Sequence, residues 1–208
     1  LGSFCGLIFS LVTAALLAIY GHVDVAFVKW SWPIPSSLGV YVDSVTAVML
    51  VLVSFVGLIV VWYSFRYLDG DARQGRFMRW MSFTIGAALL LVVSRNLVMF
   101  TAAWMLASFG LHSLLTHFPE RSWAIWAARK KFLISRLGDL MLLTALGLTY
   151  KAFGSLEYGE IFSAANAIHA GTANGSFLLH LSGAFLVLGA MTKSAQFPFH
   201  SWLPDTME

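Results

Sequence analysis

The stretch of sequence that decides the fold reads Phe177-Leu-Leu-His-Leu-Ser-Gly-Ala-Phe-Leu-Val-Leu-Gly-Ala-Met-Thr192. Lys193 follows at once, and Pro198 comes five residues later. An ammonium group at that depth in a membrane is costly, so by default it marks an ion or proton path. Pro198 has no N–H to donate to the carbonyl of Ser194, and its ring crowds that carbonyl, so a helix should break just past the lysine. A transmembrane helix broken at a charged residue is typical of transporters.

The composition predicts a polytopic membrane protein. Of the 208 residues, 59% are hydrophobic and only 11% are charged, whereas soluble domains carry about 25% charged residues. We therefore expect an all-α transmembrane bundle that forms a single domain over residues 1–208. Six apolar stretches have about the 20 residues that a bilayer core requires. They lie near 1–20, 43–65, 78–94, 96–118, 132–152 and 177–195, the last of them broken after Lys193.

The two ends of the chain suggest that it belongs to a longer protein. It begins at Leu1 without a methionine, and it stops at Glu208 directly after the expected break. We therefore expect a fragment of a longer fold.

The basic residues alternate between the connections of these spans and so predict the topology. The connections after the second and fourth spans hold nine of them: Arg66, Arg73, Arg76, Arg79, Arg121, Arg129, Lys130, Lys131 and Arg136. The opposite side holds only Lys29, Arg95 and Lys151. This distribution fits the positive-inside rule with a cytoplasmic N-terminus. The net charge of +3 therefore reflects topology, and we expect no nucleic-acid partner.

Two connections on the other side have features of the membrane interface. Residues 22–41 include Trp30 and Trp32, and tryptophan suits the headgroup layer. In residues 156–168 apolar side chains recur at helical spacing, with Glu157 and Glu160 on the other face. The pattern predicts a short interfacial helix.

Five residues are candidates for an ion or proton pathway: Lys193, Asp139, Arg136, His112 and His200. Arg136 and Asp139, three residues apart on a helix, can pair on one face. A histidine can both donate and accept a proton near neutral pH. Each has a plainer alternative: Lys193 could extend to the headgroups, the Arg136–Asp139 pair could be structural, and the histidines could be hydrogen-bonded packing residues.

Other chemistry is not indicated. The chain has no serine–histidine–acid combination, no glycine-rich phosphate loop and no Cys/His set with metal-ligand spacing. We expect no covalent catalysis, metal or cofactor in this chain by itself.

The final motif, Lys193-Ser-Ala-Gln-Phe-Pro-Phe-His-Ser-Trp-Leu-Pro-Asp-Thr-Met-Glu208, resembles the broken-helix motif of the antiporter-like subunits of respiratory complex I and of Mrp sodium/proton antiporters. Supporting matches are Val42-Asp-Ser-Val-Thr46, Asn96-Leu-Val-Met99, Trp104 and Ser135-Arg-Leu-Gly-Asp139. The resemblance implies that the six spans are the second to seventh of a longer protein, and that Lys193 is a channel lysine.

One departure from that pattern points to a subfamily. Where those subunits have a glutamate that pairs with the channel lysine, this chain has Met105, which cannot balance an ammonium group. The segments His112–Arg121 and Ala127–Asp139 resemble the membrane subunit of bacterial Dab-type inorganic-carbon accumulation complexes.

The Dab-type resemblance implies a bacterial inner-membrane protein. It would use a cation or proton gradient, together with a cytoplasmic partner similar to a zinc β-carbonic anhydrase, to drive hydration of carbon dioxide to bicarbonate. The zinc would belong to the partner. Two alternatives remain: a proton-pumping subunit of a quinone-linked NADH dehydrogenase or Mrp antiporter, and a passive membrane anchor.

Overall fold

The computed structural model describes residues 2–21, 23–30, 36–169 and 176–206, which are mostly helical. The elements are, in chain order, α1 (Gly2–Tyr20), β1 (Val23–Trp30), β2 (Ser36–Val42), α2 (Ser44–Tyr67), α3 (Gln74–Val92), α4 (Leu97–Leu115), α5 (Ser122–Phe153), α6 (Tyr158–His169), α7 (Ser176–Lys193), the 3-10 turn η1 (Phe199–Ser201) and α8 (Trp202–Asp205).

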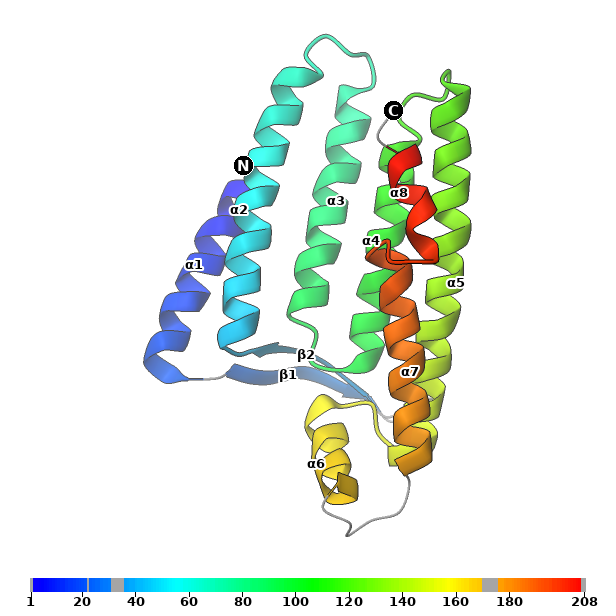
Figure 1. Cartoon of the computed structure of the whole chain (residues 1–208). Coiled ribbons are helices and arrows are strands. Elements are labelled where there is room, and N and C mark those ends of the chain that lie inside the picture. Colours follow the sequence, from blue (N-terminus) through cyan, green and yellow to red (C-terminus); the bar gives the residue numbers. More distant parts are fainter. Residues whose placement is uncertain (1, 22, 31–35, 170–175, 207–208) are drawn as a thin grey trace.

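Helices α1 to α5 and α7 lie side by side and run alternately up and down (Figure 1). Contacts link each helix to the next, from α1 through α5, and α7 packs on α5. The connections α2–α3 and α4–α5 lie at one end of the bundle, which we call the basic end. The strands and α6 lie at the other, which we call the hairpin end.

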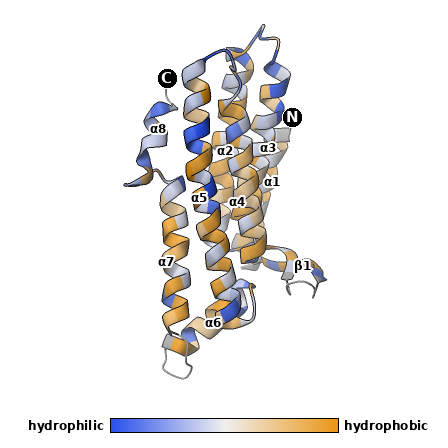
Figure 2. Cartoon of the chain, turned by 90° about the vertical axis from the view of Figure 1, so that its right-hand side faces the viewer, coloured by the Kyte–Doolittle hydropathy of each residue, from blue (hydrophilic) through white to orange (hydrophobic). Residues whose placement is uncertain are grey.

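The outer surface of the bundle is apolar. Large side chains such as Phe9, Val45 and Trp62 are exposed, and hydrophobic residues cover most of α4 and α7 (Figure 2). Helices α2, α4 and α5 are each long and apolar enough to cross a membrane, and shorter apolar stretches lie in α1 and α7. An apolar surface of this extent requires lipid or protein to cover it. The chain is thus a multi-pass membrane protein.

The structure differs from the sequence expectations at two points. The all-α prediction holds for most of the described residues, but it did not include β1 and β2, which form an antiparallel hairpin. Alternating β-branched residues, including Val23, Val25, Val40 and Val42, favour these strands. Trp32, which we expect in the headgroup layer, lies outside the described residues. The span predicted at 132–152 belongs to a helix that begins ten residues earlier, at Ser122, because residues 122–131 contain no helix breaker. Lys130 and Lys131 are therefore helical residues and not part of a connection.

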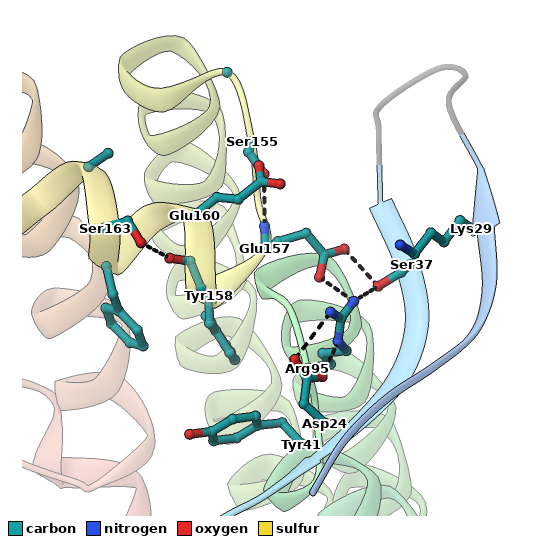
Figure 3. Close-up of a pocket in the computed structure, with 14 residues that line it drawn as sticks. Asp24, Lys29, Ser37, Tyr41, Arg95, Ser155, Glu157, Tyr158, Glu160 and Ser163 are labelled. Carbon is teal, nitrogen blue, oxygen red and sulfur yellow. Dashed lines mark hydrogen bonds and ion pairs between the residues drawn. The ribbon is translucent and has the colours of Figure 1, made fainter. Parts of the chain in front are cut away.

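The helix expected near residues 156–168 is confirmed as α6. Arg95 ties it to the hairpin at the hairpin end (Figure 3). The guanidinium of Arg95 pairs with Asp24 of β1, donates to Ser37 Oγ of β2 at 2.6 Å and pairs with Glu157 at 3.0 Å. The hydrogen bond to Asp24 raises the pKa of Arg95 above its ordinary value, so its charge persists. These residues line a pocket of about 830 Å³ between the hairpin and α6.

The tightest contact between helices joins α5 to α7. A Cβ atom added to Gly138 would lie only 2.1 Å from Thr192 Oγ1, and one added to Gly189 would lie 3.3 Å from the Gly138 carbonyl oxygen. Small residues of this kind let helix backbones approach closely. Gly138 thus fixes the last turn of α7, and with it Lys193, against α5.

We predict that Gly138→Ala destabilises the protein. Overpacking a buried contact costs about 1–3 kcal/mol, and Thr192 is a buried, β-branched residue that cannot easily give way. Gly147→Ala on the same helix is the control, because an added Cβ there has no atom within 4 Å and should raise helix stability by about 0.5–1 kcal/mol. Thermal unfolding in detergent measures both, and equal effects of the two substitutions would contradict the close contact.

We also predict that Arg95→Gln loosens the hairpin end. Its side chain is only 21% exposed, and losing it leaves the carboxylates of Asp24 and Glu157 without their cation, at a cost of about 1–3 kcal/mol. Amide hydrogen exchange should rise in β1, β2 and α6. Arg76→Gln, at an exposed position of α3, should leave exchange at this end unchanged. Unaltered exchange in the Arg95 variant would show that its ion pairs do not hold these elements.

Candidate functional site

Helix α7 ends at Lys193, as the position of Pro198 predicts. The helix stops about midway along α4 and α5, and α8 continues beside α5 toward the basic end (Figures 1 and 2). Ala195 has a positive φ of 51°, which turns the chain out of the helical path.

Two contacts hold the segment after the break. The indole nitrogen of Trp202 donates to the carbonyl of Thr192 at 3.1 Å, which satisfies one of the carbonyls left free where α7 ends. Lys130 of α5 pairs with Asp205 of α8 at 2.7 Å. The broken segment is therefore attached both to the end of α7 and to α5.

The amine of Lys193 faces α4. Its Nζ lies 4.0 Å from the centroid of the Trp104 ring, and it donates to the Trp104 carbonyl at 3.4 Å. A cation over an indole face is stabilised by the ring quadrupole. Among the described residues, no carboxylate lies within 4 Å of this amine, although the charge of Asp139 still acts on it. Lys193 is therefore a cation held by an aromatic ring and a backbone dipole.

The predicted contact between Arg136 and Asp139 is present, with Arg136 Nη2 2.7 Å from Asp139 Oδ2. The side chain of Asp139 is only 5% exposed, whereas that of Arg136 is 42% exposed and stacks on Phe132. Neither oxygen of Asp139 has a well-aligned hydrogen bond. The carboxylate is thus buried beside one cation and retains capacity to accept a proton.

Lys131 is the residue that the sequence reasoning missed. The residue is only 4% exposed, and its Nζ donates to the carbonyl of Ser108 at 3.0 Å. A helical pattern could have revealed it, because Ala127, Ala128, Gly138 and Asp139 lie on the same buried face of α5. Its neighbours Arg129 and Lys130 make it resemble part of a basic connection in the sequence.

The two predicted histidines have different environments. The ring of His112 lies 5.0 Å from the ring of Phe132, and its buried Nδ1 has no hydrogen-bond partner among the described residues. His200 is exposed and stacks on Phe197. No contact recorded for the described part of the chain joins His200 to Lys193 or Asp139.

Polar residues of three helices form a row that we call the polar strip. Its members are Trp104, Ser108 and His112 of α4, Lys131, Arg136 and Asp139 of α5, and Lys193 of α7. The strip extends from the break in α7 toward the basic end. Its amines, carboxylate and imidazole can each bind and release a proton. In the described part of the chain, no group of three or more His, Cys, Asp or Glu residues is placed to hold a metal ion.

Comparisons of sequence connect this chain to known membrane subunits. The family model for the transmembrane region of NADH:quinone oxidoreductase and Mrp antiporters matches residues 94–208. The model for the chain 5 N-terminus of NADH-ubiquinone oxidoreductase (complex I) matches residues 32–78.

Two curated relatives illustrate the range of similar proteins. A probable inorganic carbon transporter subunit, DabB2, from Halothiobacillus neapolitanus is 44% identical over 172 residues, which is 83% of this chain and 30% of that protein. The chloroplastic NAD(P)H-quinone oxidoreductase subunit 5 of Lemna minor is 36% identical over 207 residues, or 98% of this chain and 27% of that protein. The chain therefore spans less than a third of either relative.

Solved structures contain the same fold. The Mrp complex from Dietzia sp. DQ12-45-1b matches with a TM-score of 0.79 and 25% identity, covering 99% of this chain and 22% of that chain. The membrane-bound sulfane sulfur reductase, an archaeal respiratory complex, matches with a TM-score of 0.81 and covers 98% of this chain and 40% of that chain. At 14% identity the latter shares the fold alone. Since the family model matches more than half of its residues, the chain belongs to the NADH:quinone oxidoreductase/Mrp antiporter family of membrane subunits.

Proposed function

We propose that this chain is the ion-translocating part of an antiporter-like membrane subunit, and that the ion is a proton. In this proposal α1 to α5 and α7 all cross the membrane, and Lys193 is the central titrating group. The observation that carries the proposal is the position of that amine, at a helix break midway along the bundle, beside Trp104 and without a paired carboxylate among the described residues.

The polar strip favours an ion pathway over a passive membrane anchor as the role of this chain. Unpaired charge in a membrane interior is costly and marks ion paths, whereas a passive anchor has no need of it. Asp139 and Arg136 would form a charge pair on the cytoplasmic side of Lys193, and His112 would be a relay group. His200 stays a weaker candidate, because it stacks on Phe197 and no contact recorded for the described residues joins it to the polar strip.

We place the protein in a bacterial inner membrane with its basic end and its N-terminus in the cytoplasm. The basic residues of the α2–α3 and α4–α5 connections, and of the helix ends beside them, support this orientation by the positive-inside rule. The hairpin end, with the Arg95 ion pairs, would then face the opposite side.

We further propose that the complex takes up inorganic carbon, with proton flow driving a cytoplasmic partner similar to a zinc carbonic anhydrase. The support is the 44% identity to a protein named as a probable inorganic carbon transporter subunit, together with Met105 in place of an acid. The zinc would reside in the partner, and this chain would hold no cofactor.

A second candidate function is proton pumping in a quinone-linked dehydrogenase or an Mrp antiporter. The identity to the chloroplastic quinone oxidoreductase subunits and the fold shared with the Mrp complex favour it. Both candidates use the same lysine, so they differ in partner and not in the pathway.

We predict that Lys193→Met abolishes gradient-dependent transport while the complex still assembles. Methionine has similar length but cannot carry a proton, and removing a group that transfers protons costs about 100-fold or more in rate. A pH-sensitive dye in proteoliposomes that contain the intact complex measures the flux. Lys151→Met, at an exposed position near the end of α5, should transport like the unmodified protein. Full flux in the Lys193 variant would remove this amine from the mechanism and favour the anchor.

We predict that the full-length protein purifies with a zinc-containing soluble protein in about equal amounts. Elemental analysis and mass spectrometry of the mildly solubilised complex would test this. Purification with quinone-reductase or Mrp subunits instead would establish the second candidate function.

A further inference from the structure

Two amines donate to α4 at adjacent turns. Lys193 donates to the carbonyl of Trp104 at 3.4 Å, and Lys131 donates to the carbonyl of Ser108 at 3.0 Å. These carbonyls are four residues apart on one face of α4, a rise of about 6 Å. Each carbonyl has a second lone pair beyond the one used in the helix, so α4 presents two successive acceptor positions for an ammonium group.

Lys131 lacks the partner that a permanently charged buried lysine requires. It is more deeply buried than Lys193, and among the described residues its ammonium has no carboxylate within 4 Å. A buried charge is normally paired. With one backbone carbonyl as its recorded acceptor, the charged form of Lys131 is only weakly stabilised, and loss of a proton leaves a neutral amine suited to that site.

The groups that face Lys131 come from three helices. Its amine feels the charges of Arg136 and Asp139 on its own helix and of Lys193 at the end of α7. On α4 it lies one turn from His112, whose imidazole feels the charge of Lys131 in turn. Trp104, Ser108 and His112 are spaced by four residues, so the row covers about 12 Å toward the basic end.

We propose that Lys131 is a second proton carrier, which relays protons between the basic end of the bundle and Lys193. This inference rests on the proposed function and adds to it a residue that lies outside the five candidates drawn from the sequence. In the transfer, an N–H bond breaks at the ammonium of Lys131, the proton passes through a bridging water, and a new N–H bond forms at the neutral amine of Lys193. One amine becomes neutral, the other becomes charged, and the total charge is unchanged.

The arrangement explains how the step could proceed without an acid at Met105. Two like charges about one helical turn apart in a medium of low dielectric repel strongly. Single protonation of the pair is therefore favoured over double protonation, and arrival of a proton at one amine promotes its release from the other. The acceptor carbonyls of Ser108 and Trp104 stabilise whichever amine holds the charge.

The test replaces Lys131 in the full-length protein within its complex and measures proton flux in proteoliposomes. Lys131→Met should lower the flux about 100-fold or more, since a proton-transferring group is lost. Lys131→His should retain part of the flux with a pH profile moved to lower pH, because imidazole ionises at lower pH than an amine. A purely structural lysine would not produce that shift.

Each outcome of these measurements either supports or overturns the relay. Flux that is lost with Lys131→Met, and that returns at lower pH with Lys131→His, supports the relay. Unchanged flux with Lys131→Met overturns it, and so does an unshifted profile with Lys131→His if the methionine variant fails to assemble. The proposed function is tested separately: if the unmodified complex conducts and Lys193→Met does not, an active Lys131→Met removes the relay alone. A complex that does not conduct at all removes both.

Discussion

The close approach of α5 and α7 at Gly138 and Thr192 is the constraint on which the candidate site depends. Any side chain at Gly138 would meet Thr192, the residue just before Lys193. Glycine at this point lets the end of α7 lie against α5 while its lysine reaches across to α4. The same last turn supplies the Thr192 carbonyl that receives the indole N–H of Trp202. One contact thus sets the depth of the amine and the course of the chain beyond the break.

The two ends of the bundle are held by different means than its middle. At the hairpin end, Arg95 and Asn96 connect β2, the start of α4 and α6 through ion pairs and hydrogen bonds, and Asn96 also caps α4 by accepting the Met99 N–H at 2.8 Å. At the basic end, Arg73 pairs with Glu120 and so joins the α2–α3 connection to the α4–α5 connection. Ion pairs and hydrogen bonds thus stabilise the two ends, whereas the middle of the bundle is packed mainly by apolar side chains. The charged residues of the polar strip are the exception there.

The sequence predicted the features that follow from local chemistry. A lysine at the end of an apolar run, followed by a proline, gave the break at Lys193, and a spacing of three residues gave the contact of Arg136 with Asp139. The features that the sequence did not predict depend on tertiary contacts. The hairpin forms through pairing of residues up to about 20 apart. Lys131 looks in the sequence like any other member of a basic cluster, and only its contact with α4 distinguishes it. His200 was expected near the pathway because it follows the break, but chain proximity does not bring it to Asp139.

The balance of charge in the polar strip separates a conducting role from a structural one. It contains three strong bases and a single carboxylate, and Asp139 lies against Arg136. Arginine does not release its proton in proteins, so within that pair only Asp139 can exchange one. The charges left without a partner belong to Lys131 and Lys193, and both lie against dipoles of α4 that solvate an ammonium group only in part. A purely structural strip would be at lower energy with apolar residues at these two positions. Lys131, which bears the desolvation cost of burial without a fixed counter-ion, is suited to a charge that moves.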